Sequence, residues 1–150
     1  MRRPPTPPPA GPPTAEPIGL LVARVAKTLN REFEATLAEA GGSLPTWLIL
    51  VSVKSGRPAT QRELADAIGI RAATLTHHLA ALERDGLVTR RRAPSNRRVQ
   101  VVELSEAGEA LFERLRGAAL AFDARLRDGF GEAEVARLRA LLGRLAANVG

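Results

Sequence analysis

Cysteine is absent from the 150 residues, which excludes disulfides, thiolate nucleophiles and every zinc site with sulfur ligands. The only histidines, His77 and His78, are adjacent. Neighbours on a helix point about 100° apart, so this pair does not favour a shared metal ion. No apolar run approaches the roughly 18 residues of a membrane helix, and no apolar segment follows Arg2 and Arg3 as in a signal peptide. Motifs of P-loop enzymes, α/β-hydrolases and metalloproteases are also missing. We therefore expect a cytoplasmic protein that needs no membrane, metal or cofactor and is not an enzyme.

Positive charge is concentrated in one short segment. The chain has 22 Lys+Arg against 16 Asp+Glu, a formal net charge of +6. Residues 84–98 contain six arginines and one acid, a net +5, so the other 135 residues carry about +1. A single basic patch on a nearly neutral body is typical of a nucleic-acid binder. A merely solvated arginine-rich loop is the alternative.

The N-terminus and the segments after it differ sharply in composition. Residues 1–17 hold eight of the eleven prolines, which predicts a disordered tail, with a polyproline II docking segment as the alternative. Apolar residues spaced by three and four then predict a helix over 18–40, and a second helix fits residues 46–55. Gly56-Arg57-Pro58 is expected to end that second helix. Thr60 followed by a glutamate three residues on has the pattern of a capping box, which starts a third helix.

The middle of the chain predicts a helix–turn–helix followed by a β-hairpin. A fourth helix fits residues 71–85 and is closed by Gly86. Runs of β type at 87–90 and 99–104 flank the sequence RRRAPSNRR, which predicts two strands joined by a long basic loop. These elements together are a winged helix–turn–helix.

The long helices on either side have apolar faces that are too large for so small a module to cover. Ser105 caps a long helix, and the last helix carries apolar residues at spacings of 3, 4, 3 and 4, a coiled-coil seam. The expected fold is therefore mainly α (α+β), with a DNA-binding core over about 46–104 and dimerisation helices over about 18–40 and 105–148. The predicted homodimer interface consists of Val22, Val25, Leu29, Leu126, Val135, Leu138, Leu142, Leu145 and Val149.

The stretch from Thr60 to Gly108 resembles the MarR family of dimeric winged-helix transcriptional regulators. Its most specific elements are LADAIGI, TLTHHLAALERDGLV and NRRVQVVELSEAG. The last is similar to the family's wing pattern, D-x-R followed by a strand and L-[ST]-x-x-G. The helical arrangement extends the resemblance over residues 18–148. It implies a sequence-specific regulator of transcription, a ligand-responsive repressor that binds a pseudo-palindromic operator as a homodimer. Asn96 departs from the family's aspartate and supplies no charge to steady Arg98.

Three surfaces are expected to contact double-stranded DNA. The fourth helix places small residues opposite its buried leucines, which suits the major groove, with a merely solvated face as the alternative. The start of the third helix suits phosphates, and Arg97 and Arg98 suit the minor groove. Arg71 stands where the family often has a Ser-like cap and is expected to reach a phosphate instead. The predicted DNA-binding residues are Thr60, Gln61, Arg62, Arg71, Ala73, Thr74, Thr76, His77, Arg84, Arg90, Arg92, Asn96, Arg97 and Arg98.

The resemblance also implies a pocket for a small aromatic or anionic effector between the winged module and the dimer helices. Its predicted lining is Ile18, Leu21, Arg24, Trp47, Val51, His78 and Phe112, with Arg24 facing a carboxylate or phenolate. Alternatively, Trp47 is a core aromatic and Arg24 a surface charge. Two rival functions stay open: an effector-independent architectural DNA-binding protein, and a relative of the winged-helix dimerisation domain of some methyltransferases. The methyltransferase-type domain would leave the basic wing of the hairpin without a role.

Overall fold

A computed structural model describes residues 15–55 and 60–150, with the backbone alone at positions 98 and 99. The expected proline-rich tail, up to residue 14, and the expected helix break at Gly56-Arg57-Pro58 lie outside the described residues. The chain divides into two compact units, residues 1–32 and 33–150, each of which is described by itself.

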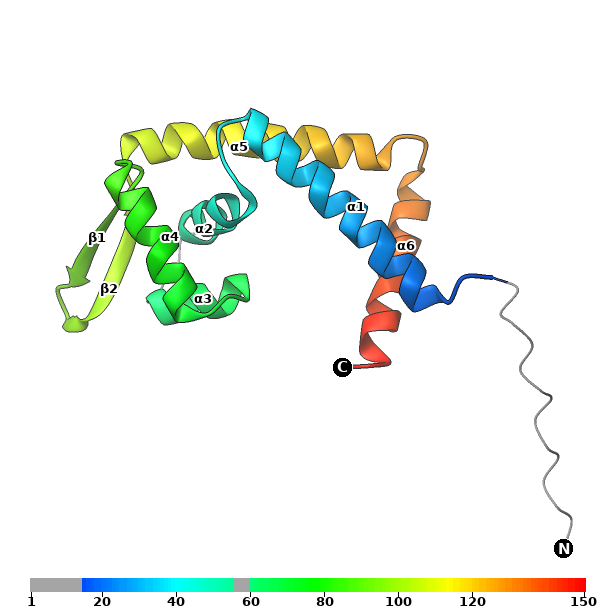
Figure 1. The fold of residues 1–150 in the computed structure, drawn as a ribbon, viewed down its shortest axis with the longest axis horizontal. Coiled ribbons are helices and arrows are strands. Elements are labelled where there is room, and N and C mark those ends of the chain that lie inside the picture. The colour runs from blue at the N-terminus through cyan, green and yellow to red at the C-terminus, as the bar shows by residue number, and fades with distance from the viewer. Residues whose placement is uncertain (1–14, 56–59) are drawn as a thin grey trace, which may run out of the picture. The chain divides into compact units, whose positions relative to one another are not determined.

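Helices and one two-stranded antiparallel sheet make up the described chain (Figure 1). In chain order these are α1 (Ile18–Glu39), α2 (Leu44–Lys54), α3 (Gln61–Ile68), α4 (Ala72–Arg84), β1 (Val88–Ala93), β2 (Asn96–Leu104), α5 (Glu106–Arg127) and α6 (Glu132–Ala147). The expected winged helix–turn–helix with long terminal helices is confirmed. No single helix in the described ranges is long and apolar enough to cross a membrane, although α1 and α2 would meet that test together as a bent pair.

The helix ends follow from capping chemistry. Thr60 caps α3 with the expected capping box: its hydroxyl accepts from the Glu63 amide at 3.1 Å, and the Glu63 carboxylate accepts from the Thr60 amide at 3.0 Å. Ser105 caps α5 by accepting from the Gly108 amide at 3.1 Å. The second helix begins two residues earlier than expected, because Ser43 caps it and Pro45 occupies its first turn, where a missing amide costs nothing.

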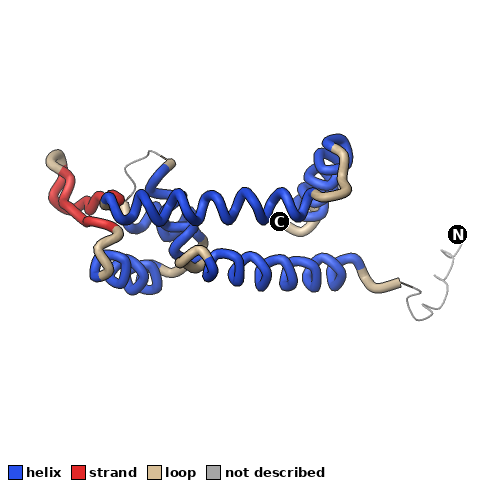
Figure 2. Tube along the Cα trace, turned by 90° about the horizontal axis from the view of Figure 1, so that it is seen from above, coloured by secondary structure: helices blue, strands red, loops and turns tan. Residues whose placement is uncertain are grey.

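The β-hairpin differs most from expectation. Its strands run through the arginines and are joined by the two residues Pro94 and Ser95, so the long basic loop predicted over 90–98 is wrong. Ladder hydrogen bonds are made by the backbone, so polar side chains do not end a strand whose faces are solvated. Arg92 pairs with Gln100 and Ala93 with Asn96, which leaves residues 97–99 as a bulge in β2. In Figure 2 the hairpin projects beyond the helices around its base.

The core lies where the winged helix meets α2 and α5. Leucines at the expected positions 75, 79 and 82 form the buried side of α4. They join a cluster of buried residues from α1, α2, α3, both strands and α5, which contains Leu37, Ile49, Leu50, Leu64, Ala65, Val88, Val102, Leu111, Phe112 and Leu115. Phe112 stacks on Trp47 with ring centroids 5.8 Å apart. This apolar cluster joins the helix–turn–helix, both strands, α2 and α5 in one core.

The two ends of the hairpin are closed against the start of α5. The Leu87 carbonyl accepts the Ser105 amide at 3.0 Å, and the Ser105 hydroxyl donates to the Gly86 carbonyl at 2.5 Å. Gly108 passes so close that an added Cβ would lie 2.0 Å from the Leu87 carbonyl oxygen. The glycine is required there because the obstacle is backbone, which cannot rotate away.

The last helix, α6, has no buried residue although its sequence is rich in leucine. Leu138 is 50% exposed and Val149 90% exposed. Phe130, before this helix, and Leu120, on α5, are also exposed. Apolar surface of this kind is unusual for a chain that acts alone.

Candidate nucleic-acid interface

The exposed side of α4 is small and polar, as expected. Ala73, Thr74 and His77 are exposed, opposite the buried leucines. Thr76 is exposed on a flank of the helix, where its hydroxyl donates to the Ala72 carbonyl at 2.9 Å. A helix with such short side chains can enter a major groove without steric conflict.

Arginines mark both ends of this helix. Arg71 is the residue before α4, is exposed and makes no side-chain cap. Arg84 is the last residue of the helix, where a cation suits the dipole. The exposed face of α4 therefore has an arginine at each end.

A depression of about 540 Å³ lies between the start of α3 and the hairpin. Its lining consists of Thr60, Gln61, Arg62, Arg92, Arg97 and Gln100. The capping box occupies the hydroxyl and amide of Thr60 and the amide of Glu63. The amides of Gln61 and Arg62 come first in the helix, where no intrahelical acceptor exists. Three arginines and these donors face one hollow, which suits an anion such as a phosphate of a nucleic-acid backbone.

The hairpin divides its arginines between two faces. Arg92 and its cross-strand partner Gln100 lie toward the depression, and Arg97 joins them from the bulge. Arg91, on the other face, donates to the Glu103 carboxylate at 2.7 Å. This hydrogen bond holds the pKa of Glu103 below its usual value.

The remaining predicted wing residues are placed less fully. Asn96 is exposed at the start of β2, opposite Ala93. The backbone of Arg98 lies in the bulge, and its side chain is outside the described part of the chain.

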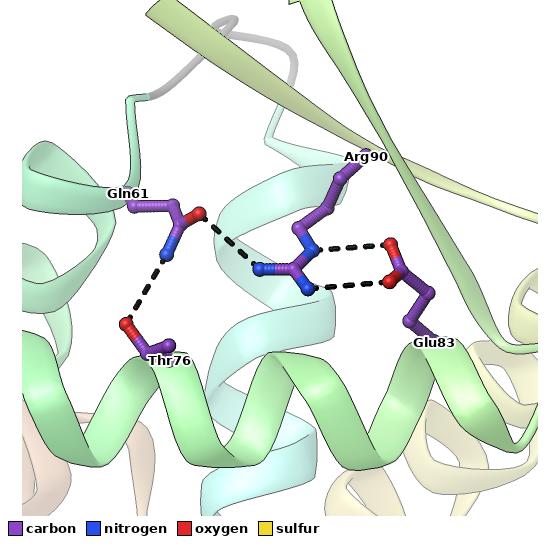
Figure 3. A network of polar contacts seen from close by, with 4 residues as sticks. All are labelled: Gln61, Thr76, Glu83 and Arg90. Carbon is purple, nitrogen blue, oxygen red and sulfur yellow. Dashed lines mark hydrogen bonds and ion pairs between the residues drawn. The ribbon is translucent and has the colours of Figure 1, made fainter.

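Arg90 is engaged inside the protein. Its side chain is 21% exposed and binds the Glu83 carboxylate through two nitrogens, at 3.0 and 3.2 Å (Figure 3). The third nitrogen donates to the side-chain oxygen of Gln61 at 3.4 Å. The side-chain nitrogen of Gln61 in turn donates to the Thr76 hydroxyl at 3.4 Å. The hydrogen bond from Arg90 also lowers the pKa of the Glu83 carboxyl.

The predicted effector residues belong to different units. In residues 15–32, Ile18 is exposed, Leu21 is half-buried, and Arg24 pairs with Glu16 at 2.8 Å. In residues 33–150, Trp47 stacks on Phe112, while Val51 is exposed and His78 half-buried. Because the two sets belong to different units, the predicted pocket stays a prediction.

Sequence reasoning missed two residues of this region, Gln100 and Glu83. Alternation along β2 provides a signal for Gln100, since it shares a face with the buried Val102. Alternation along β1 likewise puts Arg90 on the face of Val88, the core side. Glu83 lies in the last turn of a helix, where a negative charge is unfavourable without a partner.

Comparison with known proteins agrees with this arrangement. The MarR family model matches residues 43–99. The transcriptional repressor CouR, solved with a 23-mer DNA duplex, is 25% identical over 86% of this chain and 92% of its own, with a TM-score of 0.77. CouR from Rhodococcus jostii RHA1, solved with p-coumaroyl-CoA, gives a TM-score of 0.74 at 25% identity, covering 86% of this chain and 91% of that chain. A mutant MarR from E. coli, complexed with operator DNA, shares the fold at 24% identity and a TM-score of 0.75, covering 85% of this chain and 92% of that chain.

Proposed function

Because the chain belongs to the MarR family of transcriptional regulators, we propose that it is a ligand-responsive repressor that binds a pseudo-palindromic operator as a homodimer. The observation that carries DNA binding is the gathering of Arg62, Arg92 and Arg97 around one depression between the start of α3 and the hairpin. Such a cluster neutralises backbone phosphates, while the short side chains of α4 read base edges in the adjacent major groove.

Each predicted contact except Arg90 has a role in this scheme. Thr74, Thr76 and His77 read bases, and Ala73 permits the close approach of the helix. Thr60, Gln61, Arg62, Arg71 and Arg84 contact phosphates at helix ends. Arg92, Arg97 and Arg98, with Asn96, act in the wing, where a narrow minor groove attracts arginine.

A homodimer explains the apolar surface. The predicted interface residues Val25, Leu126, Leu138, Leu142 and Leu145 are all exposed in the single chain. A second copy would cover these residues through the same surface on both partners, and the two-fold axis would present two recognition helices to one operator. The symmetry of the protein then accounts for the symmetry of the DNA site.

An aromatic acid or its thioester is the effector class we propose. The relative CouR was solved with p-coumaroyl-CoA, and the Trp47–Phe112 stack offers an aromatic surface. Binding there would be coupled to DNA release through a change in the spacing of the recognition helices, with reciprocal effects on the two affinities.

The effector is tested through Trp47, the only tryptophan in a chain without tyrosine. Aromatic carboxylates and their coenzyme A thioesters are titrated into the protein–operator complex, and tryptophan emission is recorded together with DNA release. We expect every compound that releases DNA to change this emission, and Arg24→Ala to weaken anionic effectors without changing DNA affinity. A compound that releases DNA and leaves the emission constant would place the pocket elsewhere.

Nuclease footprinting across the protein's own upstream region tests the repressor assignment. We expect one or two protected sites of about two helical turns, each with half-sites about 10 base pairs apart. Uniform protection of any duplex would support the architectural alternative. Absence of protection, followed by failure to select any duplex from a random pool, would refute DNA binding.

A further inference from the structure

Besides the apolar core and the closure on Ser105 at its root, the hairpin is held to the helices by a polar network around Arg90. Beyond the pair formed by Arg90 and the buried Val102, none of the hairpin side chains that the structure describes is buried. A two-stranded hairpin is marginally stable alone, so its direction depends on contacts at the base. Arg90 supplies polar contacts there to α4 through Glu83 and to α3 through Gln61.

The position of Glu83 is electrostatically unfavourable unless its carboxylate pairs with Arg90. It lies in the last turn of α4, where the dipole disfavours a negative charge. It also places an anion next to a surface that attracts phosphates. The two-nitrogen contact with Arg90 compensates both effects, since a guanidinium fork matches a carboxylate in geometry and charge.

The network also limits the contacts that Arg90 can make with DNA. Each of its three guanidinium nitrogens donates to a protein oxygen. Arg91 is 51% exposed, and within the described part of the chain it bonds only to Glu103 in the hairpin, so it has no part in fixing the wing to the helices. These bonds use three of the five N–H donors of a side chain that is only 21% exposed, so a phosphate that approached Arg90 would compete with Glu83 and Gln61.

We propose that Gln61, Thr76, Glu83 and Arg90 form a clamp that sets the wing at a fixed angle to the recognition helix α4 before DNA arrives. Arg90 is then a positioning residue, in place of the phosphate contact that its charge suggests. The clamp rests on the proposed function, since its purpose is to present the wing and α4 to one DNA site together.

The clamp and a simple phosphate contact predict opposite changes in DNA affinity for Glu83→Ala. Removal of a negative charge beside DNA would strengthen binding if Arg90 merely neutralised a phosphate. Loss of the clamp instead lowers the fraction of wings that are ready to bind. If that fraction falls to about one third in each protomer, the apparent affinity of the dimer falls about ninefold.

The experiment is fluorescence anisotropy of the full-length protein with its footprinted operator over a range of salt concentrations. We expect Glu83→Ala and Arg90→Ala each to weaken binding roughly five- to tenfold with an unchanged salt slope. The double variant should bind DNA no more weakly than whichever single variant has the lower affinity, because the same Arg90–Glu83 interaction is lost in both single variants and in the double variant. The matched control is Glu103→Ala, which removes the same charge from a pair internal to the hairpin, and it should bind at least as tightly as the wild type.

Arg90→Lys separates the two explanations even if an alanine variant unfolds. Lysine keeps the charge but loses the fork, so the clamp predicts weakened binding and a phosphate contact predicts near wild-type binding. Glu83→Ala that binds as tightly as the wild type, or Arg90→Ala that lowers the salt slope by about 2 per dimer, overturns the clamp. If the wild type binds no duplex, the proposed function itself fails, a result distinct from a wild type that binds and variants that are unaffected.

Discussion

Replacing Arg92 and Arg97 together by alanine should change how DNA binding depends on salt. Both side chains are exposed and line the same depression, so each is expected to neutralise one phosphate. A dimer then loses four such contacts. At a slope of about −0.9 per phosphate, the magnitude of d log K/d log[salt] should fall by about 3.6.

This change is large over an ordinary range of conditions. Between 50 and 200 mM salt, log[salt] rises by about 0.6, so the wild type should lose on the order of 150-fold more affinity than the variant. The assay is fluorescence anisotropy with the operator duplex at five or more salt concentrations. The matched control, Arg116→Ala with Arg125→Ala, removes the same charge from α5, outside the hairpin, and should change the slope by less than about 1. An unchanged slope in the Arg92/Arg97 variant would refute the assignment of the depression to phosphates.

Three further predictions concern assembly and stability. Leu138→Glu with Leu142→Glu should give monomeric or unfolded protein, because the exposed seam of α6 can no longer be covered; an unaltered sedimentation coefficient would contradict the dimer. Gly108→Ala should lower the free energy of unfolding by about 1–3 kcal/mol or more in urea, since its Cβ meets a backbone carbonyl. Gly117→Ala, in the same helix with nothing within 4 Å, should instead stabilise by about 0.5–1 kcal/mol. Glu83 has a folded-state pKa below the ordinary 4.5, so its stabilisation is present above that pH and is lost as the pH falls through the lowered pKa; Glu83→Gln should flatten this part of the pH–stability curve, and a curve of unchanged steepness would contradict the pairing.

Elements governed by local chemistry were predictable from the sequence. Thr60 and Ser105 mark helix starts because their hydroxyls satisfy amides three residues ahead. The buried side of α4 follows from its leucines, since a helix turns about 100° per residue. Such features depend on a few neighbouring residues and need no knowledge of the rest of the fold.

Elements governed by contacts between distant residues could not be predicted from the sequence. The arginines of the hairpin resemble a loop because nothing in their polarity shows that the backbone continues its ladder to Ala93. In the sequence Arg90 is one more cation for DNA, because its partners Glu83 and Gln61 are seven and 29 positions away. The exposed face of α6 is visible in the sequence, but the surface that covers it belongs to another chain in our proposal.

The closure of the hairpin on the first turn of α5 has a mechanical consequence. The root of the wing is joined to the helix by backbone contacts and by the Ser105 hydroxyl, at Gly86, Leu87, Ser105 and Gly108, and these contacts leave little freedom. A helix of 22 residues is about 33 Å long, so the wing root sits at the tip of a stiff lever. A tilt of about 5° around the far end moves that root by about 3 Å, close to the length of a hydrogen bond to a phosphate. Because Leu111, Phe112 and Leu115 hold this end of α5 in the core, such a tilt would carry the core and the wing together, and it is large enough to take the wing out of register with its groove.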